Sequence, residues 1–436
     1  MKSGLKMSKV LSMLIVITML ASLVMTGCSK STGEKDNSSK AEVQQDKKVT
    51  LTFFGLGQLK NEMEYFKSTI QKFKSQNPNV EFEETYANDA DLNTKMNVAF
   101  AGGSAPDIIY TSISSTISRA ANNQLEPLDG YMSQWGGKDK FLERNLQLGT
   151  YKSKLYAIGL RADPRVLLYR KDFFKEVGLD PEKPPKTWEE FADYAVKLTK
   201  KENGQVVRGG ADIPTTNGSL FLAPFIFQNG GKIADEDNDK LTINSPEAIE
   251  ALKYVADLYK KGVSVVHDGN KLDELPFVKG KSAMSFTNLN SYITMTTNDP
   301  TLKDKIGFSA SLERKSKAAQ SGLICLSITK DSKYKKEASN FLSLMLSDDE
   351  TWSRYQTMGV IPIKSSLQDK FISDNPKVNQ VLSDSVKVGI TRPRTSWGAV
   401  YMNYEKAAYE AVVVGNTSAE ESLATLEKNL NKAIQK

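Results

Sequence analysis

Apolar residues recur along this chain with two periods, one typical of strands and one typical of helices. β-rich apolar runs occupy 49–55, 80–86 and 106–110. Residues spaced by three or four positions predict two helices between these runs, one ending at Asn77-Pro78 and one over 89–100. We expect Asn61 to cap the first helix. This order predicts a parallel sheet with crossover helices.

The alternation continues through the rest of the chain. A capping box over 187–190 opens a helix with apolar residues on one face, and Ser245-Pro246 starts another that ends before Gly262. Later helical patterns cover 338–345 and the segment after a second capping box at 418–421. The pattern as a whole predicts the α/β class.

One continuous apolar run over 10–20 breaks this pattern near the N-terminus. Lys2, Lys6 and Lys9 flank it on one side, and small residues lead to Gly27-Cys28 on the other. Such a segment is typical of a secretory signal peptide. A membrane span is the alternative, but this run is shorter than the roughly 20 residues that cross a bilayer. The stretch resembles the lipobox of bacterial lipoproteins.

The lipobox resemblance implies that residues 1–27 are removed as a lipoprotein signal peptide and that Cys28 carries lipid. Residues 28–48 hold almost no large apolar side chain, so we expect a disordered tether. Two or more acyl chains anchor a protein stably, which predicts a location on the outer face of the cytoplasmic membrane. Cys325 is then the only other cysteine, so we expect a buried thiol, no disulfide within the chain and a monoderm bacterium as the source.

Composition narrows the class of protein. The chain is 39% hydrophobic and 25% charged, as in ordinary globular proteins. Removing residues 1–27 takes away three lysines and lowers the net charge from +6 to +3, and no basic tract carries interleaved aromatic residues. Nucleic acid is therefore not an expected partner. His267 is the only histidine, which excludes a histidine-based triad and a multi-histidine metal site, and no cofactor is expected.

Ten short motifs follow one another along almost the whole chain beyond the tether. They lie at 53–55, 99–110, 124–129, 154–159, 168–174, 178–179, 185–191, 229–231, 277–284 and 359–362. In this order they resemble the extracellular solute-binding proteins of carbohydrate ABC importers, the family that includes the maltose-binding protein.

The resemblance implies a two-lobed periplasmic-binding-protein-like fold with a hinge and a cleft between the lobes. Each lobe would be a mostly parallel sheet flanked by helices. One lobe would comprise 49–159 plus 313–364, and the other 160–312 plus 365–436. The chain would cross between lobes near 158–165, 310–320 and 363–368. A length of about 390 residues beyond the tether independently predicts two domains.

The same resemblance implies a binding protein rather than an enzyme. A sugar or oligosaccharide would bind in the cleft, the lobes would close on it, and the monomer would dock on the transmembrane subunits of an ABC permease. A ligand that touches both lobes favours the closed state through its extra contacts there.

Candidate ligand-binding residues follow from the chemistry of sugars, whose C–H faces suit aromatic rings and whose hydroxyls suit planar polar side chains. Phe54, Gly55 and Gln58 follow the first strand, and Tyr110 and Ser112 follow the third. The resemblance places both loops at the cleft. In open α/β sheets, ligands bind at the carboxyl ends of the strands.

Charged and amide residues supply the second group of candidates. Arg161, Asp163 and Arg165 alternate along a predicted crossing, and a surface salt-bridge cluster is the alternative interpretation. Asn288 and Asn290 follow another predicted strand, where ordinary turn residues are the alternative.

A third group lies in the segment 392–397, which we expect to be an exposed loop. It holds Arg392 and Trp397, the best aromatic platform candidate, because a tryptophan at a loop tip usually has a binding partner. The two predicted cleft segments 161–165 and 392–397 together hold four arginines. Because arginine pairs well with carboxylates, an acidic sugar such as a uronate is a narrower candidate for the ligand.

Two other functions stay open at this point. A surface glycoside hydrolase needs two carboxylates about 5–9 Å apart, and 52 acidic residues do not exclude such a pair. A ligand-presenting partner of a membrane sensor kinase would have the same fold and the same binding site.

Overall fold

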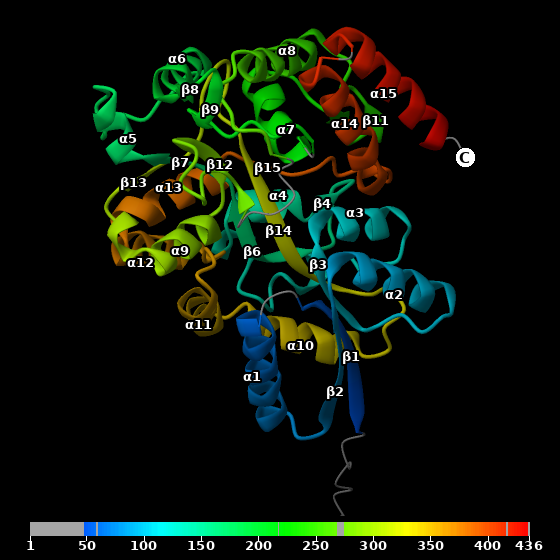
Figure 1. Cartoon of the computed structure of the whole chain (residues 1–436). Coiled ribbons are helices and arrows are strands. Elements are labelled where there is room, and N and C mark those ends of the chain that lie inside the picture. Colours follow the sequence, from blue (N-terminus) through cyan, green and yellow to red (C-terminus); the bar gives the residue numbers. More distant parts are fainter. Residues whose placement is uncertain (1–47, 58–59, 217, 268–273, 416, 435–436) are drawn as a thin grey trace, which may run out of the picture. The chain divides into compact units, whose positions relative to one another are not determined.

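The computed structural model describes residues 48–57, 60–216, 218–267, 274–415 and 417–434 (Figure 1). The predicted signal peptide 1–27, the lipidated Cys28, the tether up to residue 47 and the candidate Gln58 lie outside these described residues. Within the described ranges, no helix combines the length and the apolar content that a bilayer crossing requires.

The largest sheet has the strand order β15-β14-β3-β1-β2, and β6 pairs with β14 beside this path. β1 runs parallel to both β2 and β3, which confirms the parallel unit predicted for the start of the folded part. β14 runs antiparallel to β3 and β6. The strands are β1 (Val49–Leu56), β2 (Val80–Ala87), β3 (Ile108–Ser112), β6 (Ile158–Pro164), β14 (Ala319–Ile328) and β15 (Gly389–Ile390).

We call lobe 1 the part of the chain whose apolar side chains form one cluster around this sheet. Phe53 of β1 contacts Phe66 of α1 and Phe341 of α10, and all three rings are fully buried. The remaining elements of lobe 1 are short strands, single turns and helices: β4 (Thr150–Tyr151), β5 (Lys154–Leu155), η1 (Asp129–Tyr131), η2 (Lys138–Lys140), α1 (Lys60–Gln76), α2 (Asp89–Ala101), α3 (Ile113–Ala121), α4 (Glu143–Leu148), α10 (Lys335–Met345) and α11 (Asp348–Met358).

Lobe 2 is built on a three-stranded sheet of order β12-β7-β13, with β7 (Val166–Arg170) between β12 (Met284–Thr287) and β13 (Ile306–Ser309). Both neighbours run antiparallel to β7, so the expected mostly parallel sheet is wrong for this lobe. β12, α9 and β13 do form a strand–helix–strand unit. However, β7 lies between β12 and β13 in the sheet and runs antiparallel to both. β12 and β13 therefore do not pair with each other, as a local crossover would predict.

The two faces of the lobe 2 sheet are both buried. Side chains alternate along β7, with Leu167 in one apolar cluster and Val166 and Leu168 in another on the opposite face. The elements around them are α5 (Lys171–Glu176), α6 (Trp188–Leu198), β8 (Lys200–Glu202), β9 (Gln205–Arg208), α7 (Ser219–Gln228), β10 (Ala234–Asp235), β11 (Lys240–Leu241), α8 (Pro246–Lys260), α9 (Leu289–Asn298), η4 (Pro300–Leu302), η5 (Ser365–Leu367), α12 (Gln368–Asp374), α13 (Pro376–Lys387), α14 (Gly398–Val413) and α15 (Ala419–Ile434).

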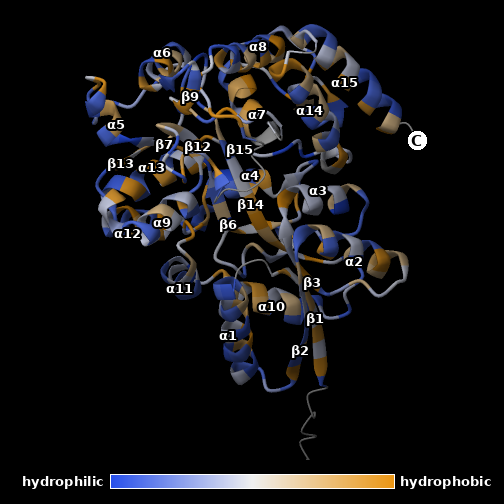
Figure 2. Cartoon of the chain, viewed as in Figure 1, coloured by the Kyte–Doolittle hydropathy of each residue, from blue (hydrophilic) through white to orange (hydrophobic). Residues whose placement is uncertain are grey.

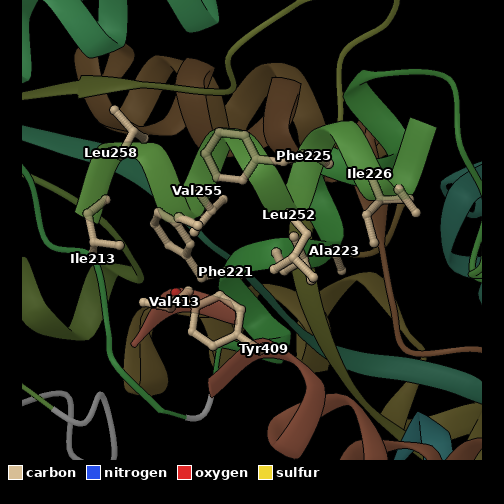
Figure 3. Close-up of a cluster of buried hydrophobic side chains, with 14 of the residues drawn as sticks. Ile213, Phe221, Ala223, Phe225, Ile226, Leu252, Val255, Leu258, Tyr409 and Val413 are labelled. Carbon is tan, nitrogen blue, oxygen red and sulfur yellow. The ribbon is translucent and has the colours of Figure 1, made fainter. Parts of the chain in front are cut away.

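Helices α7, α8 and α14 supply much of the larger lobe 2 cluster. Figure 3 shows Phe225 of α7, Val255 of α8 and Tyr409 of α14 among side chains that converge on one interior, and all three are almost completely buried. α7 is apolar along most of its length, whereas α1 and α15 alternate between polar and apolar residues (Figure 2). A helix that is apolar all round is typical of a buried element, and an amphipathic helix of a surface one.

Local signals in the sequence set several helix ends. The Thr187 hydroxyl accepts a hydrogen bond from the backbone N–H of Glu190 at 3.2 Å, as the first capping box predicts. Ser245 caps α8 in the same way. The expectation for Asn61 is wrong, because this residue lies inside α1 and its side chain donates to the backbone oxygen of Thr357 at 3.4 Å.

Strands β6 and β14 pass side by side from one lobe to the other. Ile158 and Leu160 of β6 belong to the lobe 1 cluster, whereas Val166, just beyond its end, belongs to lobe 2. On β14, Ala319 belongs to lobe 2 and Leu323 to lobe 1. This distribution supports the predicted crossings, and the domain limits 49–159 plus 313–364 and 160–312 plus 365–436 stay a proposal.

Candidate ligand-binding site

The pairing of β6 with β14 aims a row of polar side chains near the crossing. The register shifts between Ile324 and Cys325, so Leu160 of β6 is left over as a β-bulge. A bulge changes the direction of the residues that follow it. Arg161, Asp163 and Arg165 come next at alternate positions, which places them on one side of the extended chain. None of the three is fully buried.

Arg161 forms an ion pair with a carboxylate that the sequence analysis did not identify. Glu62 of α1 is fully buried, and its Oε1 lies 3.3 Å from Nη1 of Arg161. The hydroxyl of Tyr110 donates to the same oxygen at 2.6 Å. Burial raises the pKa of Glu62, while Arg161 and Tyr110 lower it. A signal for Glu62 existed in its spacing, since it lies four residues before Phe66 on the apolar face of α1.

Tyr110 is therefore a structural residue rather than a platform for a sugar. Its ring is fully buried and lies 4.5 Å from the ring of Phe66, centroid to centroid. The expected ligand contact of this side chain is wrong because the strand continues to Ser112 and carries Tyr110 into the core of lobe 1.

The end of β1 is also shaped by packing, because Phe54 and Gly55 lie inside this strand and not in a loop after it. Phe54 is half-buried and packs against the lobe 1 cluster. A Cβ atom at Gly55 would lie 2.5 Å from a ring carbon of Phe53 and 3.1 Å from one of Tyr86, so only glycine fits there. Gly55 thus serves the packing of β1, whatever its relation to a ligand.

Asp163 and Asn288 connect the crossing strand to lobe 2. The Asn288 amide donates to Oδ2 of Asp163 at 3.1 Å, and its side-chain oxygen accepts from the backbone N–H of Ser291 as the N-cap of α9. Asn288 is thus a helix cap and a partner of a crossing-strand residue at once. Asn290 lies in α9 and is exposed.

Arg392 lies between β15 and α14, and it brings a third segment to the same region. It is half-buried, and its Nε is buried with no hydrogen-bond partner among the described residues. Burial lowers the pKa of Arg392, and two acidic groups, Glu405 of α14 and Asp89 of α2, oppose this effect. Asp89 in turn accepts a hydrogen bond from the hydroxyl of Ser112 at 3.4 Å. Residues of both lobes therefore face Arg392.

Glu405 is a second carboxylate that the sequence analysis missed. It is 2% exposed, and burial raises its pKa from 4.5 to about 7, while Tyr401 and Arg392 lower it. Its Oε1 has no hydrogen-bond partner among the described residues. Nothing in the local sequence marks Glu405, because its neighbours along α14 include charged and apolar residues alike.

The expectation of an exposed loop at 392–397 is wrong for Trp397. Its side chain is 3% exposed and belongs to the larger lobe 2 cluster, and its Nε1 donates to the backbone oxygen of Asp239 at 2.8 Å. The acidic turn that connects β10 and β11 holds the loop, since Nε and Nη2 of Arg394 both donate to Oε2 of Glu236. Arg394 also donates to the backbone oxygens of Gln147 and Thr150 in lobe 1.

A small cavity opens beside Arg165, where α7 approaches the crossing strands. Its volume is about 10 Å³, room for about one water molecule, so no sugar ring fits it in this conformation. Phe221, Phe225 and Phe286 provide aromatic walls. The polar walls include Gln228 and Ser311. Phe221 and Phe225 also belong to the larger lobe 2 cluster, and Phe286 packs against it.

The side chains around the crossing strands are of the kinds that bind ligands. Aromatic faces, amides, guanidinium groups and carboxylates surround the crossing strands, and these groups recognise hydroxyls and charged substituents. In the described part of the chain, no cluster of three histidine, cysteine, aspartate or glutamate side chains could hold a metal ion. Cys325 is fully buried, as predicted, and burial raises its pKa to about 12, which makes it an unreactive thiol.

Residues 57–352 match the family model of the bacterial extracellular solute-binding proteins. Since the match covers more than half of the chain, the chain belongs to this family.

The curated relatives agree at lower coverage. The chain is 29% identical over 213 residues to the sn-glycerol-3-phosphate-binding periplasmic protein UgpB of Escherichia coli (strain K12), and equally so to UgpB of Shigella dysenteriae. The match covers 45% of this chain and 46% of each relative, so the chain spans less than half the length of the curated relatives it matches.

Solved structures show the same fold over most of the chain. A solute-binding protein from Thermotoga lettingae bound with α-D-tagatose has a TM-score of 0.73 at 24% identity, covering 88% of this chain and 99% of that one. A cyclic α-maltosyl-1,6-maltose binding protein from Arthrobacter globiformis has a TM-score of 0.75 at 21% identity, covering 88% and 98%. The chain thus has the two-lobed fold of periplasmic binding proteins.

Proposed function

We propose that this chain is the extracellular substrate-binding lipoprotein of an ABC importer, which captures a sugar or oligosaccharide between its lobes and delivers it to the permease unaltered. The observation that carries the proposal is the meeting of polar side chains from both lobes around β6 and β14. Asp89 of lobe 1 and Glu405 of lobe 2 both act on Arg392, and Asp163 of the crossing strand is held by Asn288 of lobe 2. Membership of the family of bacterial extracellular solute-binding proteins supports the role of a binding protein.

A saccharide ligand is supported by the chemistry of the walls and by the relatives. Aromatic rings and polar side chains occur together beside Arg165. Proteins of the same fold were solved with α-D-tagatose and with cycloalternan, the latter from Listeria monocytogenes. The curated relatives are named for sn-glycerol-3-phosphate, also a small polyhydroxylated molecule.

The residues that we propose for the ligand are the candidates of the sequence analysis except for two. Gln58, which lies outside the described residues, is kept on the sequence alone. Tyr110 and Trp397 are withdrawn, because both side chains are buried in the cores of their lobes. The proposed set comprises Phe54, Gly55, Gln58, Ser112, Arg161, Asp163, Arg165, Asn288, Asn290 and Arg392.

Capture in this proposal depends on a hinge at the crossing strands. Residues 321–323 of β14 pair with β6 alone, whereas β15 pairs before them and β3 after them, so this stretch is a two-stranded antiparallel ribbon. A register shift follows directly at Ile324 and Cys325, and strands can bend at such an interruption. A ligand that contacts both lobes shifts the population toward the closed state by its differential affinity for that state. No covalent chemistry is required of any residue, and the protein acts as a monomer.

The proposed location is the outer face of the cytoplasmic membrane, with the lipid on Cys28 and residues 29–48 as a tether. Cys28→Ser removes the thiol that would carry diacylglycerol, so the chain should leave the membrane fraction and lose incorporation of labelled palmitate. Unchanged membrane retention of Cys28→Ser would contradict the anchor and leave the binding function intact.

Equilibrium dialysis of the purified chain against a mixture of mono- and oligosaccharides tests the capture itself. We expect saturable uptake of one saccharide into the protein compartment, recovered chemically unchanged after long incubation. Shortened products would identify a hydrolase. Loss of saccharide uptake by cells lacking the chain would favour the importer component over a partner of a sensor kinase.

A further inference from the structure

Of the arginines around the crossing strands, two have an ion-pair partner among the described residues and two have none. Arg161 has Glu62 as its ion-pair partner, and Arg394 has Glu236. Arg165 and Arg392 differ, because neither guanidinium donates a hydrogen bond or forms an ion pair within 4.0 Å among the described residues. Asp163, the nearest acid along the chain, is bonded instead to Asn288.

The backbone brings these two arginines to one place. The N–H of Arg165 donates to the backbone oxygen of Gln320 at 2.7 Å. Gln320 pairs in register with Ile390, which stands two residues before Arg392. Gln320 of β14 therefore lies between the segment that carries Arg165 and the segment that carries Arg392. The proximity has an electrostatic consequence: burial lowers the pKa of Arg165, Asp163 opposes this effect, and the charge of Arg392 lowers the pKa further.

Two partly buried guanidinium groups without partners are costly, because each loses water and repels the other. Arg165 is half-buried and lines the small cavity, and Nε of Arg392 is buried. A structural role usually provides a partner, as Glu236 does for Arg394. An anion placed between the two groups would supply the missing acceptors and remove the repulsion.

We propose that Arg165 and Arg392 bind an anionic group of the captured ligand, a carboxylate or a phosphate on an otherwise polyhydroxylated molecule. This inference rests on the proposed function and narrows its ligand to acidic saccharides and sugar phosphates. Both anions present oxygen pairs that match the fork of a guanidinium, whereas a neutral hydroxyl matches a single donor.

The other charged groups that face this pair leave room for an anion. Asp163 accepts a hydrogen bond from Asn288, and Asp89 accepts one from Ser112. Glu405 has a raised pKa because of burial, so near neutral pH a substantial part of it is uncharged and repels an anion less. None of the three acids forms an ion pair within 4.0 Å with either arginine.

Isothermal titration calorimetry tests the proposal with matched ligands. The purified chain is titrated with mono-, di- and trisaccharides that carry a uronate, with their neutral counterparts, and with the corresponding sugar 6-phosphates. We expect an acidic member to bind at least about tenfold more tightly than its neutral counterpart, given the strength of charge-assisted hydrogen bonds. The uronate and phosphate arms separate the two sources of the anion.

Arg165→Gln and Arg392→Gln should each weaken binding of the acidic ligand by about tenfold to a hundredfold, and should weaken binding of its neutral counterpart by a much smaller factor. Arg208→Gln is the matched control, since Arg208 pairs with Glu176 away from the crossing strands. Arg392→Lys keeps the charge without the fork, and should lie between wild type and Arg392→Gln. Thermal melting confirms that each variant is folded.

Two outcomes would overturn the inference in different ways. Equal affinity for neutral and acidic counterparts, unaffected by Arg165→Gln and Arg392→Gln, would refute the anion site and leave saccharide capture standing. Absence of binding by every saccharide, neutral, acidic or phosphorylated, would refute the proposed function itself.

Discussion

Single side chains in this protein are governed by how deeply the fold buries them. Asp212 and Glu405 are both almost completely buried, and desolvation raises the pKa of each to about 7. Asp212 lies against the backbone N–H of Phe277, in lobe 2 away from the arginine pair. Glu405 lies beside Arg392. Burial therefore turns Glu405 into a group that titrates near neutral pH next to the proposed anion site.

The titration of Glu405 makes the stability of the chain depend on pH. Its pKa is raised from 4.5 to about 7, so between these values the folded chain holds a proton that the unfolded chain has lost. The free energy of unfolding should therefore fall as pH rises through this window, by about 3 kcal/mol from this residue. Urea unfolding at pH 5 and pH 7.5 measures the change.

Glu405→Gln removes the titrating proton, so the unfolding free energy of this variant should depend less on pH over the same window. Glu410→Gln, on the same helix at a partly exposed position, is the matched control. If Glu405→Gln and the wild-type chain lose stability equally between the two pH values, the proposed titration of Glu405 is wrong.

Trp397 illustrates the other consequence of burial. The indole is 3% exposed, contacts Tyr401 and donates a hydrogen bond to Asp239. Trp397→Ala should lower the free energy of unfolding by about 3–5 kcal/mol, the usual cost of removing a buried aromatic side chain. Denaturant unfolding measures it, with Trp352→Ala, at a half-buried position, as the milder comparison. An unchanged unfolding free energy combined with lost saccharide binding would return Trp397 to the binding surface.

At the scale of elements, the ribbon of β6 and β14 depends on one buried side chain of a neighbouring helix. Asn145 of α4 donates to the backbone oxygen of Gly159 at 3.1 Å and accepts from its N–H at 3.0 Å. Gly159 lies directly before the bulged residue Leu160, where the ladder to β14 is interrupted. Asn145 thus satisfies the backbone groups that the bulge leaves unpaired.

Asn145→Ala should leave both backbone groups of Gly159 buried without a partner and cost about 2–4 kcal/mol of unfolding free energy. Denaturant unfolding checks this value. Asn122→Ala, which removes an exposed hydrogen bond to Ser118, should change the same quantity by less than about 0.5 kcal/mol. Equal effects of the two substitutions would show that Asn145 does not support the bulge.

Elements whose signals are local could be predicted from the sequence. The capping residues Thr187 and Ser245 are confirmed, and so are the parallel strands of lobe 1, because short crossovers fix their order. The antiparallel sheet of lobe 2 could not be predicted, since more than a hundred residues separate β7 from β12.

The residues of the candidate site differ in the same way, since some follow from a local pattern and others depend on contacts between distant segments. The placement of Arg161, Asp163 and Arg165 on one side of the chain could be predicted from their two-residue spacing, and their contact with a ligand stays a proposal. Glu62 and Glu405 are far from them in sequence, so their contact depends on tertiary packing. The burial of Trp397 depends on the hairpin at 234–241, which no pattern within its own loop reveals.

At the scale of the whole molecule, groups from both lobes lie around the proposed anion site, and the three predicted chain crossings would connect the lobes beside it. Near the third predicted crossing, Ile361 packs in a lobe 2 cluster and Ile363 in the lobe 1 cluster, so side chains of both lobes meet within this short segment. A ligand that binds the folded chain between the lobes adds its binding free energy to stability.

The most direct test of the central claim, capture of a polyhydroxylated ligand by this two-lobed chain, is differential scanning calorimetry with a panel of neutral, acidic and phosphorylated saccharides. We expect one chemical class to raise the melting temperature in a saturable way, corresponding to about 2.7 kcal/mol of stabilisation at a hundred times its dissociation constant. A melting temperature unchanged by every member of the panel, at millimolar concentration, would contradict the account.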